Sequence, residues 1–117
     1  MKIGIVGSRS RDTVKDFDLV LTKFKELYKV GDIIISGGCS RGGDRFAEVI
    51  ANQLHVEIII FPANWQRYGK AAGFIRNTDI ARESDILIAC VASNRLGGTE
   101  DTVNKYLKLG KSHLYLV

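Results

Sequence analysis

Apolar residues along this chain fall into two alternating kinds of segment: short continuous runs, and longer stretches with a helical period. The continuous runs are rich in Ile, Val and Leu, with few polar residues between them. They span Lys2–Val6, Asp32–Ser36, Val56–Phe61, Asp85–Val91 and His113–Val117. Such runs are typical of strands that are buried on both faces of a parallel sheet. We therefore predict five parallel strands.

Between the runs, apolar residues recur at spacings of three and four, which predicts amphipathic helices. Three of these helices are defined by Val14, Phe17, Val20, Leu21, Phe24, Leu27 and Tyr28, by Phe46, Ala47, Val49, Ile50 and Leu54, and by Val103, Tyr106, Leu107 and Leu109. A less regular helix is expected from about Gly73 to Glu83, and Gly31 and Gly110 stand where the first and last helices should end. The alternation predicts a three-layer α/β/α fold with a five-stranded parallel sheet, formed by one domain over residues 1–117.

The composition is that of an ordinary globular protein, with 45% hydrophobic and 26% charged residues among 117. No apolar run approaches the roughly 18 to 20 residues of a membrane span, and the N-terminal MKIGIVGSR lacks the apolar stretch of a signal peptide. Cys39 and Cys90 form no CxxC pair. We therefore expect a cytoplasmic protein with reduced thiols, no metal and no membrane partner. The net charge of +4 favours an anionic partner.

Glycine and arginine gather in the segments that follow the strands. In a parallel sheet these loops share the carboxyl edge, where open α/β folds bind ligands. The loops, with the first helical turns after them, hold nine of the twelve glycines and seven of the eight arginines, but only Lys70 of the nine lysines. The arginines are Arg9, Arg11, Arg41, Arg45, Arg67, Arg76 and Arg95. The planar guanidinium suits bidentate contact with phosphate, which predicts an anion site; solvated loop charges are the alternative.

Three of the loops have the composition of phosphate-binding turns. They are SGGCSRGGD (36–44) after the second strand, Gly7-Ser8-Arg9 after the first, and Gly97-Gly98-Thr99 after the fourth. A glycine-rich turn before a helix exposes backbone N–H groups and the positive end of the helix dipole. The 36–44 segment lacks the Lys-Ser/Thr ending of a P-loop, and no GxGxxG follows the first strand. Neither a standard NTPase nor a standard dehydrogenase is therefore predicted.

The remaining loop, ANWQRYGKAAGFIRN (63–77), places Trp65 and Tyr68 among basic residues. This arrangement favours stacking on a nucleobase, and packing over the sheet edge is the alternative. His55 and His113 precede strands, so they belong to the opposite edge.

Four acidic residues remain as candidates for catalysis at the carboxyl edge, namely Asp12, Asp44, Glu100 and Asp101. Asp44 and Glu100 stand where helices begin, so capping of the helix N-terminus is the alternative role for both. Cys39 has no histidine at the same edge and is not predicted to be a nucleophile.

Four segments together resemble the SLOG superfamily of nucleotide-binding domains, and most of all its YspA/cpYpsA-related branch. They are IGIVGSR (3–9), ISGGCSRGGDRFAE (35–48), FPANWQRYGKAAGFIRN (61–77) and GGTEDTV (97–103), and they cover almost the whole chain in order. The resemblance implies a Rossmann-like fold with strand order 3-2-1-4-5. Superfamily members often dimerise, so a homodimer is a further expectation.

Two better-understood groups within this resemblance imply different activities. The Rossmann core of the DNA-processing protein DprA, which binds single-stranded DNA, is similar at Val6–Arg9, Ser36–Asp44 and Arg76–Ile80. The LOG-type phosphoribohydrolases have an arginine that Arg76 resembles and a PGGxGTxxE loop that Gly97–Thr99 resembles in part. Here no proline precedes Gly97, and Thr102 stands in place of the glutamate. This difference counts against LOG-type hydrolysis.

Three functions remain open at this point. The first is binding of a phosphate-bearing nucleotide or nucleotide derivative, as in a sensor, with no required cofactor. The second is N-glycosidic hydrolysis, with Glu100 or Asp101 stabilising oxocarbenium charge or acting as the base, helped by Arg76. The third is DprA-like binding of single-stranded DNA, which the modest charge disfavours. The predicted nucleotide- and phosphate-binding residues are Gly7, Ser8, Arg9, Ser36, Gly37, Gly38, Arg41, Gly42, Gly43, Asp44, Trp65, Tyr68, Lys70, Arg76, Asn77, Gly97, Gly98 and Thr99.

Overall fold

The computed structural model describes residues 1–39 and 41–117, and a five-stranded parallel sheet forms its centre. The strands are β1 (Lys2–Gly7), β2 (Ile33–Ser36), β3 (Ile58–Ile60), β4 (Ile86–Cys90) and β5 (Leu114–Leu116). They lie in the order β3-β2-β1-β4-β5, and every neighbouring pair is parallel. The predicted α/β fold is confirmed, and so is the strand order that the resemblance implied.

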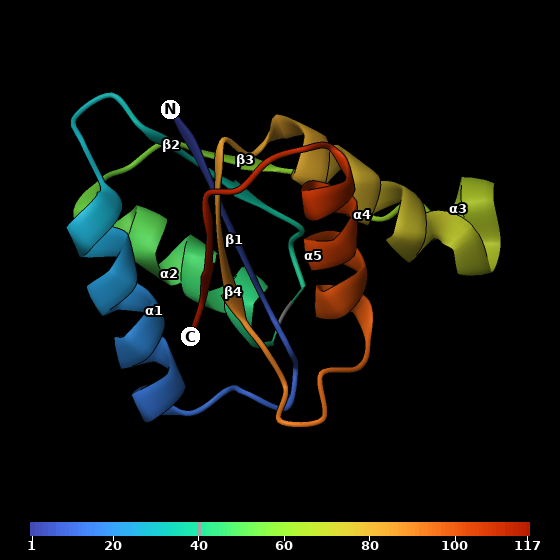
Figure 1. Ribbon diagram of the computed structural model, residues 1–117, viewed down its shortest axis with the longest axis horizontal. Coiled ribbons are helices and arrows are strands. Elements are labelled where there is room, and N and C mark those ends of the chain that lie inside the picture. Colours follow the sequence, from blue (N-terminus) through green and yellow to red (C-terminus); the bar gives the residue numbers. More distant parts are fainter. Residues whose placement is uncertain (40) are drawn as a thin grey trace.

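Helices cover both faces of this sheet (Figure 1). α1 (Val14–Leu27) and α2 (Gly43–Leu54) lie on one face, and α4 (Ala72–Glu83) and α5 (Gly98–Lys108) lie on the other. Side chains of β1 serve both layers: Ile3 and Ile5 pack with α1 and α2, whereas Val6 packs with α4 and α5. Because both faces are covered, the strand residues are apolar on both sides, which explains the continuous apolar runs of the sequence.

A short helix, α3 (Trp65–Tyr68), and a 3₁₀ turn, η1 (Gly69–Ala71), precede α4. The sequence predicts a loop here, because four residues are too few to show a helical period. Asn64 starts α3 by accepting a hydrogen bond from the Arg67 N–H at 3.1 Å. α3 stands apart from the body of the fold in Figure 1, and 57% of the Trp65 surface is exposed.

The two glycines expected at helix ends have different places. Gly110 follows the last residue of α5 closely and has a φ of +79°, as predicted. The prediction that Gly31 ends α1 is wrong, because that helix ends at Leu27. Gly31, with a φ of +98°, lies instead in the next turn, which is closed by a 2.9 Å hydrogen bond from the Asp32 N–H to the Lys29 carbonyl.

The carboxyl end of β1 and the first turn of α2 touch through their backbones. A Cβ atom on Gly43 would lie closer than 3.0 Å to the backbone of Val6 and Gly7, and one on Gly42 would meet the Ser8 carbonyl. Gly42 also has a φ of +67°, which favours glycine. Part of the glycine-rich 36–44 segment is therefore required by packing within the chain.

Candidate functional site

A cleft of about 300 Å³ opens at the carboxyl edge of the sheet, between the end of β1 and the first turns of α2 and α5. Its lining residues are Val6, Gly7, Ser8, Arg9, Cys39, Asp44, Arg76, Asn77, Ile80, Leu96, Gly97, Gly98, Thr99 and Thr102. Among them are nine of the predicted binding residues: Gly7, Ser8, Arg9, Asp44, Arg76, Asn77, Gly97, Gly98 and Thr99. The fold thus brings together residues from four segments that are far apart in the chain.

The first turn of α5 presents backbone N–H groups at this cleft. Its N-cap residue, Gly97, has a φ of +106° and no side chain that could accept hydrogen bonds from the turn. α1 differs, because it begins with Thr13, whose hydroxyl accepts a hydrogen bond from the Asp16 N–H. The first N–H groups of a helix have no partner within it and carry the positive end of the helix dipole. The start of α5, with the Thr99 hydroxyl beside it, therefore suits an anion.

Gly98 is a glycine that the packing of the described residues does not require. Its φ lies outside the left-handed region, and a Cβ atom there would meet only the Asn77 Nδ2 atom, at an ordinary 3.9 Å. Gly43 occupies the same first position of α2, but its Cβ space is filled by backbone. A side chain at Gly98 would stand in the cleft instead. The glycine keeps the start of α5 accessible to a ligand.

Hydrogen bonds from α4 connect two walls of the cleft. Arg76 donates from Nη1 to the Gly37 carbonyl at 2.9 Å and from Nε to the Asn77 Oδ1 atom at 3.1 Å. Asn77 Nδ2 donates in turn to Asp101 Oδ2 at 3.1 Å and to the Gly98 carbonyl at 3.3 Å. The adjacent residues Arg76 and Asn77 therefore tie the loop after β2 to the first turn of α5, and they fix a positive charge in the cleft wall.

Asp44 lies in the cleft lining and is 9% exposed. Its carboxylate accepts hydrogen bonds from the N–H groups of Cys39, at 3.0 Å, and of Gly37, at 3.4 Å. Burial raises the pKa of the Asp44 carboxyl, while the Cys39 N–H and the positive charge of Arg76 oppose that rise. The Ser36 hydroxyl is buried near the carboxyl, without a well-aligned partner among the described residues. Asp44 thus holds the loop before α2, whereas the capping alternative had it bonding to the first turn of its own helix.

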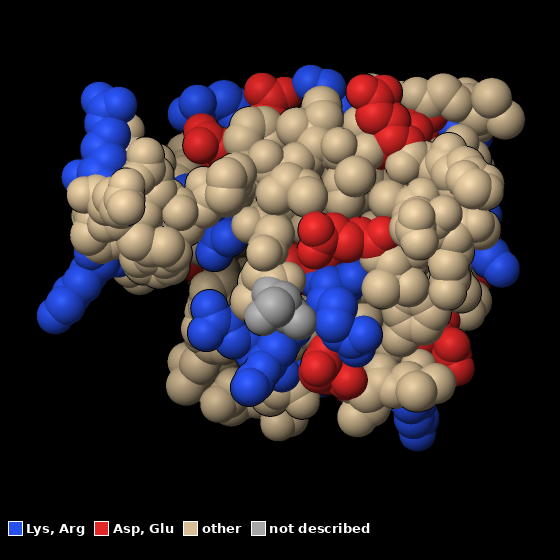
Figure 2. Space-filling model, turned by 180° about the vertical axis from the view of Figure 1, so that it is seen from behind, with Lys and Arg blue, Asp and Glu red and all other residues tan. Residues whose placement is uncertain are grey.

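Only part of the arginine group faces the cleft. Arg9 and Arg76 line it, whereas Arg41 is exposed outside the lining. Three other arginines form ion pairs at 2.8 to 2.9 Å: Arg11 with Asp16, Arg45 with Asp12, and Arg95 with Glu100. Figure 2 shows basic side chains gathered near the middle of one face with acidic side chains set among them. Arg9 and Arg76 are the arginines of the cleft lining, and the carboxyl of Asp44 lies near Arg76 in the same lining.

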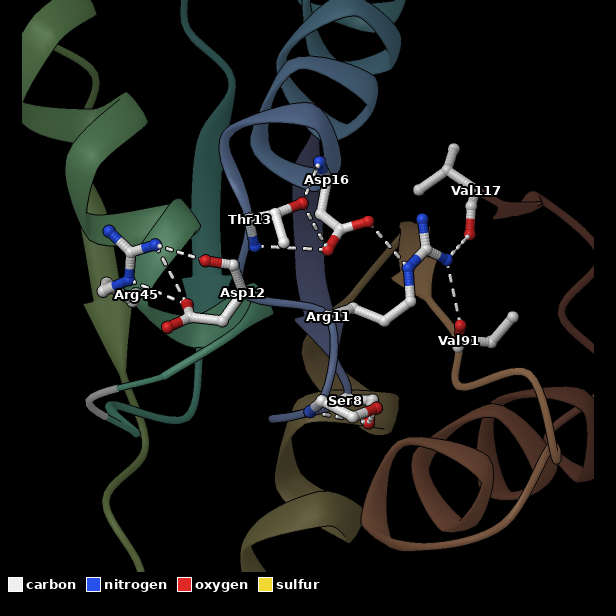
Figure 3. A network of polar contacts seen from close by, with 9 residues as sticks. Ser8, Arg11, Asp12, Thr13, Asp16, Arg45, Val91 and Val117 are labelled. Atoms are coloured by element: carbon white, nitrogen blue, oxygen red, sulfur yellow. Dashed lines mark hydrogen bonds and ion pairs between the residues drawn. The ribbon is translucent and has the colours of Figure 1, made fainter.

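Two of the ion pairs hold the loops around the cleft (Figure 3). Arg11 donates from Nη1 to the Val91 carbonyl at 2.9 Å and to the Val117 carbonyl at 2.8 Å, so it joins the loop after β1 to the loop after β4. Asp12 accepts a 2.9 Å hydrogen bond from Arg45 Nε, which ties the same loop to α2. These arginines are part of the scaffold.

The ion pair of Asp16 predicts a specific sensitivity to acid. Burial alone would raise the pKa of Asp16, but hydrogen bonds from Arg11 and Thr13 outweigh it and hold the pKa below its ordinary value of 3.8. The stabilisation is therefore present above about pH 4 and is lost as the pH falls through the lower pKa of the folded protein. We expect Asp16→Asn to reduce the free energy of unfolding by about 1–2 kcal/mol at pH 7, and by much less at pH 2.5.

Urea unfolding of both proteins at the two pH values measures this difference. Asp18→Asn removes an exposed carboxylate from the same helix and serves as the control, with little expected change at either pH. An equal loss of unfolding free energy for Asp16→Asn at both pH values would contradict a stabilising ion pair between Asp16 and Arg11, because protonation of Asp16 removes that pair.

The two candidate catalytic acids lie outside the cleft lining. Glu100 binds Arg95 through both carboxylate oxygens, at 2.8 and 2.9 Å. Asp101 forms an ion pair with Lys105 at 2.9 Å and also accepts the hydrogen bond from Asn77. Both carboxylates are thus already engaged, and the arrangement offers no support for their role as an acid or base in hydrolysis.

The predicted base-stacking residues lie away from the cleft. Trp65 and Tyr68 belong to α3 and Lys70 to η1, and Trp65 borders a separate open groove formed by residues 62–66. The exposed apolar side chain at the cleft is that of Leu96, which is 70% exposed. Leu96 was not among the predicted binding residues, although it directly precedes the predicted Gly97 in the sequence.

The other predicted residues of the 36–44 segment lie outside the cleft lining. They are Ser36, Gly37, Gly38, Gly42 and Gly43. Ser40, in the same segment, lies outside the described residues. His55 follows α2 and His113 precedes β5, so both stand at the amino edge as expected.

In residues 1–39 and 41–117, no three His, Cys, Asp or Glu side chains gather in a way that could hold a metal ion. None of the described helices is long and apolar enough to cross a membrane.

Comparison with known proteins finds a solved structure with a similar fold. No protein-family model matches the chain, and no curated protein matches it. Among solved structures, the molybdenum cofactor binding protein from the phototrophic bacterium Rippkaea orientalis is similar, with a TM-score of 0.74 and 23% sequence identity. The similarity covers 98% of this chain and 74% of that chain. At this identity, it shows that the two chains share a fold.

Proposed function

We propose that this protein binds a phosphate-bearing nucleotide or nucleotide derivative in the cleft at the carboxyl edge of the sheet. The observation that carries the proposal is the glycine-only start of α5, where Gly97 leaves the first turn without a side-chain cap and Gly98 leaves it open to the cleft. Backbone N–H groups in this arrangement bind phosphate at many helix N-termini. Arg9 and Arg76 add positive charge at the same cleft, and Ser8 and Thr99 add hydroxyl groups.

The size of the cleft favours a small ligand. A volume of about 300 Å³ is at the lower end of the roughly 300–1,000 Å³ found for small-molecule pockets. We infer that the phosphate and the group attached to it occupy the cleft, and that the rest of the ligand extends over Leu96. A cleft of this size holds only a small part of a long oligonucleotide, so single-stranded DNA is the less favoured ligand.

The resemblance to the SLOG superfamily agrees with this proposal, since the segments that carry it supply most of the cleft lining. The structural relative is a molybdenum cofactor binding protein, and that cofactor is a small-molecule ligand. We therefore include that cofactor among the candidate ligands. A nucleotide remains the first candidate, because the cleft combines an open helix start with two arginines.

Thermal unfolding with a panel of ligands tests the proposal. The panel contains AMP, ADP, ATP, GTP, NAD, ADP-ribose, cyclic nucleotides, the molybdenum cofactor and a short single-stranded oligonucleotide. A ligand at about 100 times its Kd should add roughly 2.7 kcal/mol of stability, which raises the Tm by on the order of 10 °C in a domain of this size. We expect such an increase with at least one mononucleotide or nucleotide derivative.

Arg76→Ala should lower the affinity for that ligand by about 10- to 100-fold, because a charged hydrogen bond at the cleft is lost. The increase in Tm at the same ligand concentration should then fall by half or more. Arg82→Ala is the matched control, since Arg82 lies on the same helix, is 65% exposed and does not line the cleft. If the oligonucleotide raised the Tm and no small molecule did, the proposal of nucleotide binding would be replaced by one of single-stranded DNA binding.

A further inference from the structure

The cleft has two chemically different parts. The start of α5, with Gly98 and Thr99, suits an anion, as does the side chain of Arg9. Asp44, from the first turn of α2, is the one carboxylate among the described residues that line the cleft. A phosphate close to Asp44 would be repelled by it. A bound phosphate therefore belongs on the α5 side, and a different part of the ligand faces Asp44.

The carboxylate of Asp44 is suited to accept hydrogen bonds from a ligand. Two backbone N–H groups, of Cys39 and Gly37, use only part of its capacity, because two carboxylate oxygens have about four acceptor positions. Burial raises the pKa of this carboxyl, and the two N–H groups and the nearby Arg76 oppose that rise by stabilising the charged form. A buried carboxylate in a ligand cleft is stabilised further by a donor on the ligand, and a hydroxyl group is such a donor.

We infer that Asp44 accepts a hydrogen bond from a hydroxyl of the group next to the phosphate, so the ligand class is a sugar phosphate with free ring hydroxyls, as in a ribonucleotide. This inference rests on the proposed function, since it needs a phosphate at the start of α5. Asp44 is then a residue that determines specificity, in addition to holding the loop before α2. A purely structural Asp44 would hold that loop without distinguishing one sugar from another.

Calorimetric titration separates these two roles. The probes are ribose 5-phosphate, its 2-deoxy and 3-deoxy analogues, and inorganic phosphate. The wild-type protein should bind ribose 5-phosphate at least about 10-fold more tightly than one of the deoxy analogues, because that analogue leaves an acceptor of Asp44 without its partner. In Asp44→Asn this preference should fall to about 2-fold or less, while the affinity for inorganic phosphate stays within about 2-fold of the wild-type value.

The control is Asp79→Asn, which removes a partly exposed carboxylate on α4 outside the cleft and should keep the wild-type preference. Equal affinity of the wild-type protein for all three sugars would overturn the inference, with no need for a folded variant. An equal loss for every probe in Asp44→Asn would also overturn it, because a structural role acts on all ligands alike. If the wild-type protein bound neither inorganic phosphate nor any sugar phosphate, the proposed function would fail together with the inference.

Discussion

Gly43→Ala is expected to destabilise the protein by about 3 kcal/mol or more, a large part of the 5–15 kcal/mol that is typical of a folded domain. The new Cβ atom would lie closer than 3.0 Å to backbone atoms of Val6 and Gly7. β1 is the central strand and pairs with both β2 and β4, so it cannot shift without disturbing the sheet. α2 is equally constrained, because Phe46 and Ile50 are fully buried in the core.

Gly98→Ala is the matched control for this stability experiment. Gly98 is also the first residue of a helix and also follows a glycine N-cap, but the space around its Cβ position is open. Its free energy of unfolding should lie within about 0.5 kcal/mol of the wild-type value. Urea unfolding of the three proteins provides the comparison. Equal midpoints for Gly43→Ala and the wild-type protein would show that the close contact between α2 and β1 is not required.

Gly98→Val should reduce the affinity for the ligand by more than about 100-fold while the fold is retained. Its effect is thus on binding, whereas that of Gly43→Ala is on stability. A branched side chain at this position would occupy the cleft in front of the first turn of α5, where we place the phosphate. Several charge-assisted hydrogen bonds to backbone N–H groups would then be lost together, and each contributes about 1.5–3 kcal/mol. The measurement is the ligand-dependent increase in Tm, with the strongest ligand of the panel.

The Tm without ligand is the internal control in this case, and it should differ little from that of the wild-type protein. Gly98→Ala should have an intermediate effect on binding, since it adds only one methyl group. A normal ligand-dependent increase in Gly98→Val would place the phosphate elsewhere, and it would remove the main support for the proposed function.

The elements of this fold were predictable because their signals are local. The apolar run at 2–6 covers β1 except its last residue, and the run at 85–91 encloses β4. The helical period of residues 14–28 marks α1 to within one residue. The short α3 and the place of Gly31, in a turn beyond the end of α1, were not predictable in this way. A helix of four residues shows no period, and the position of Gly31 depends on a turn that the Asp32 side chain stabilises through the Lys29 N–H.

The candidate site was predictable only in part. The edge of the sheet follows from the topology, and nine predicted residues meet there. The aromatic residues Trp65 and Tyr68 do not, because α3 carries them away from the cleft. Glu100 was a reasonable candidate acid from its place in the sequence, yet in the structure it pairs with Arg95.

The succession of strands and helices, and the concentration of glycine and arginine at one edge, follow from local sequence, because hydrophobic period and loop position are properties of neighbouring residues. Which of those residues line the cleft depends on contacts between segments that are far apart in the chain. Arg11 reaches carbonyls 80 and 106 positions away, whereas Arg76 is held at the cleft by a carbonyl 39 positions away. Gly43 and Gly98 are alike in sequence context, but backbone of β1 fills the space beside the first and the cleft lies beside the second.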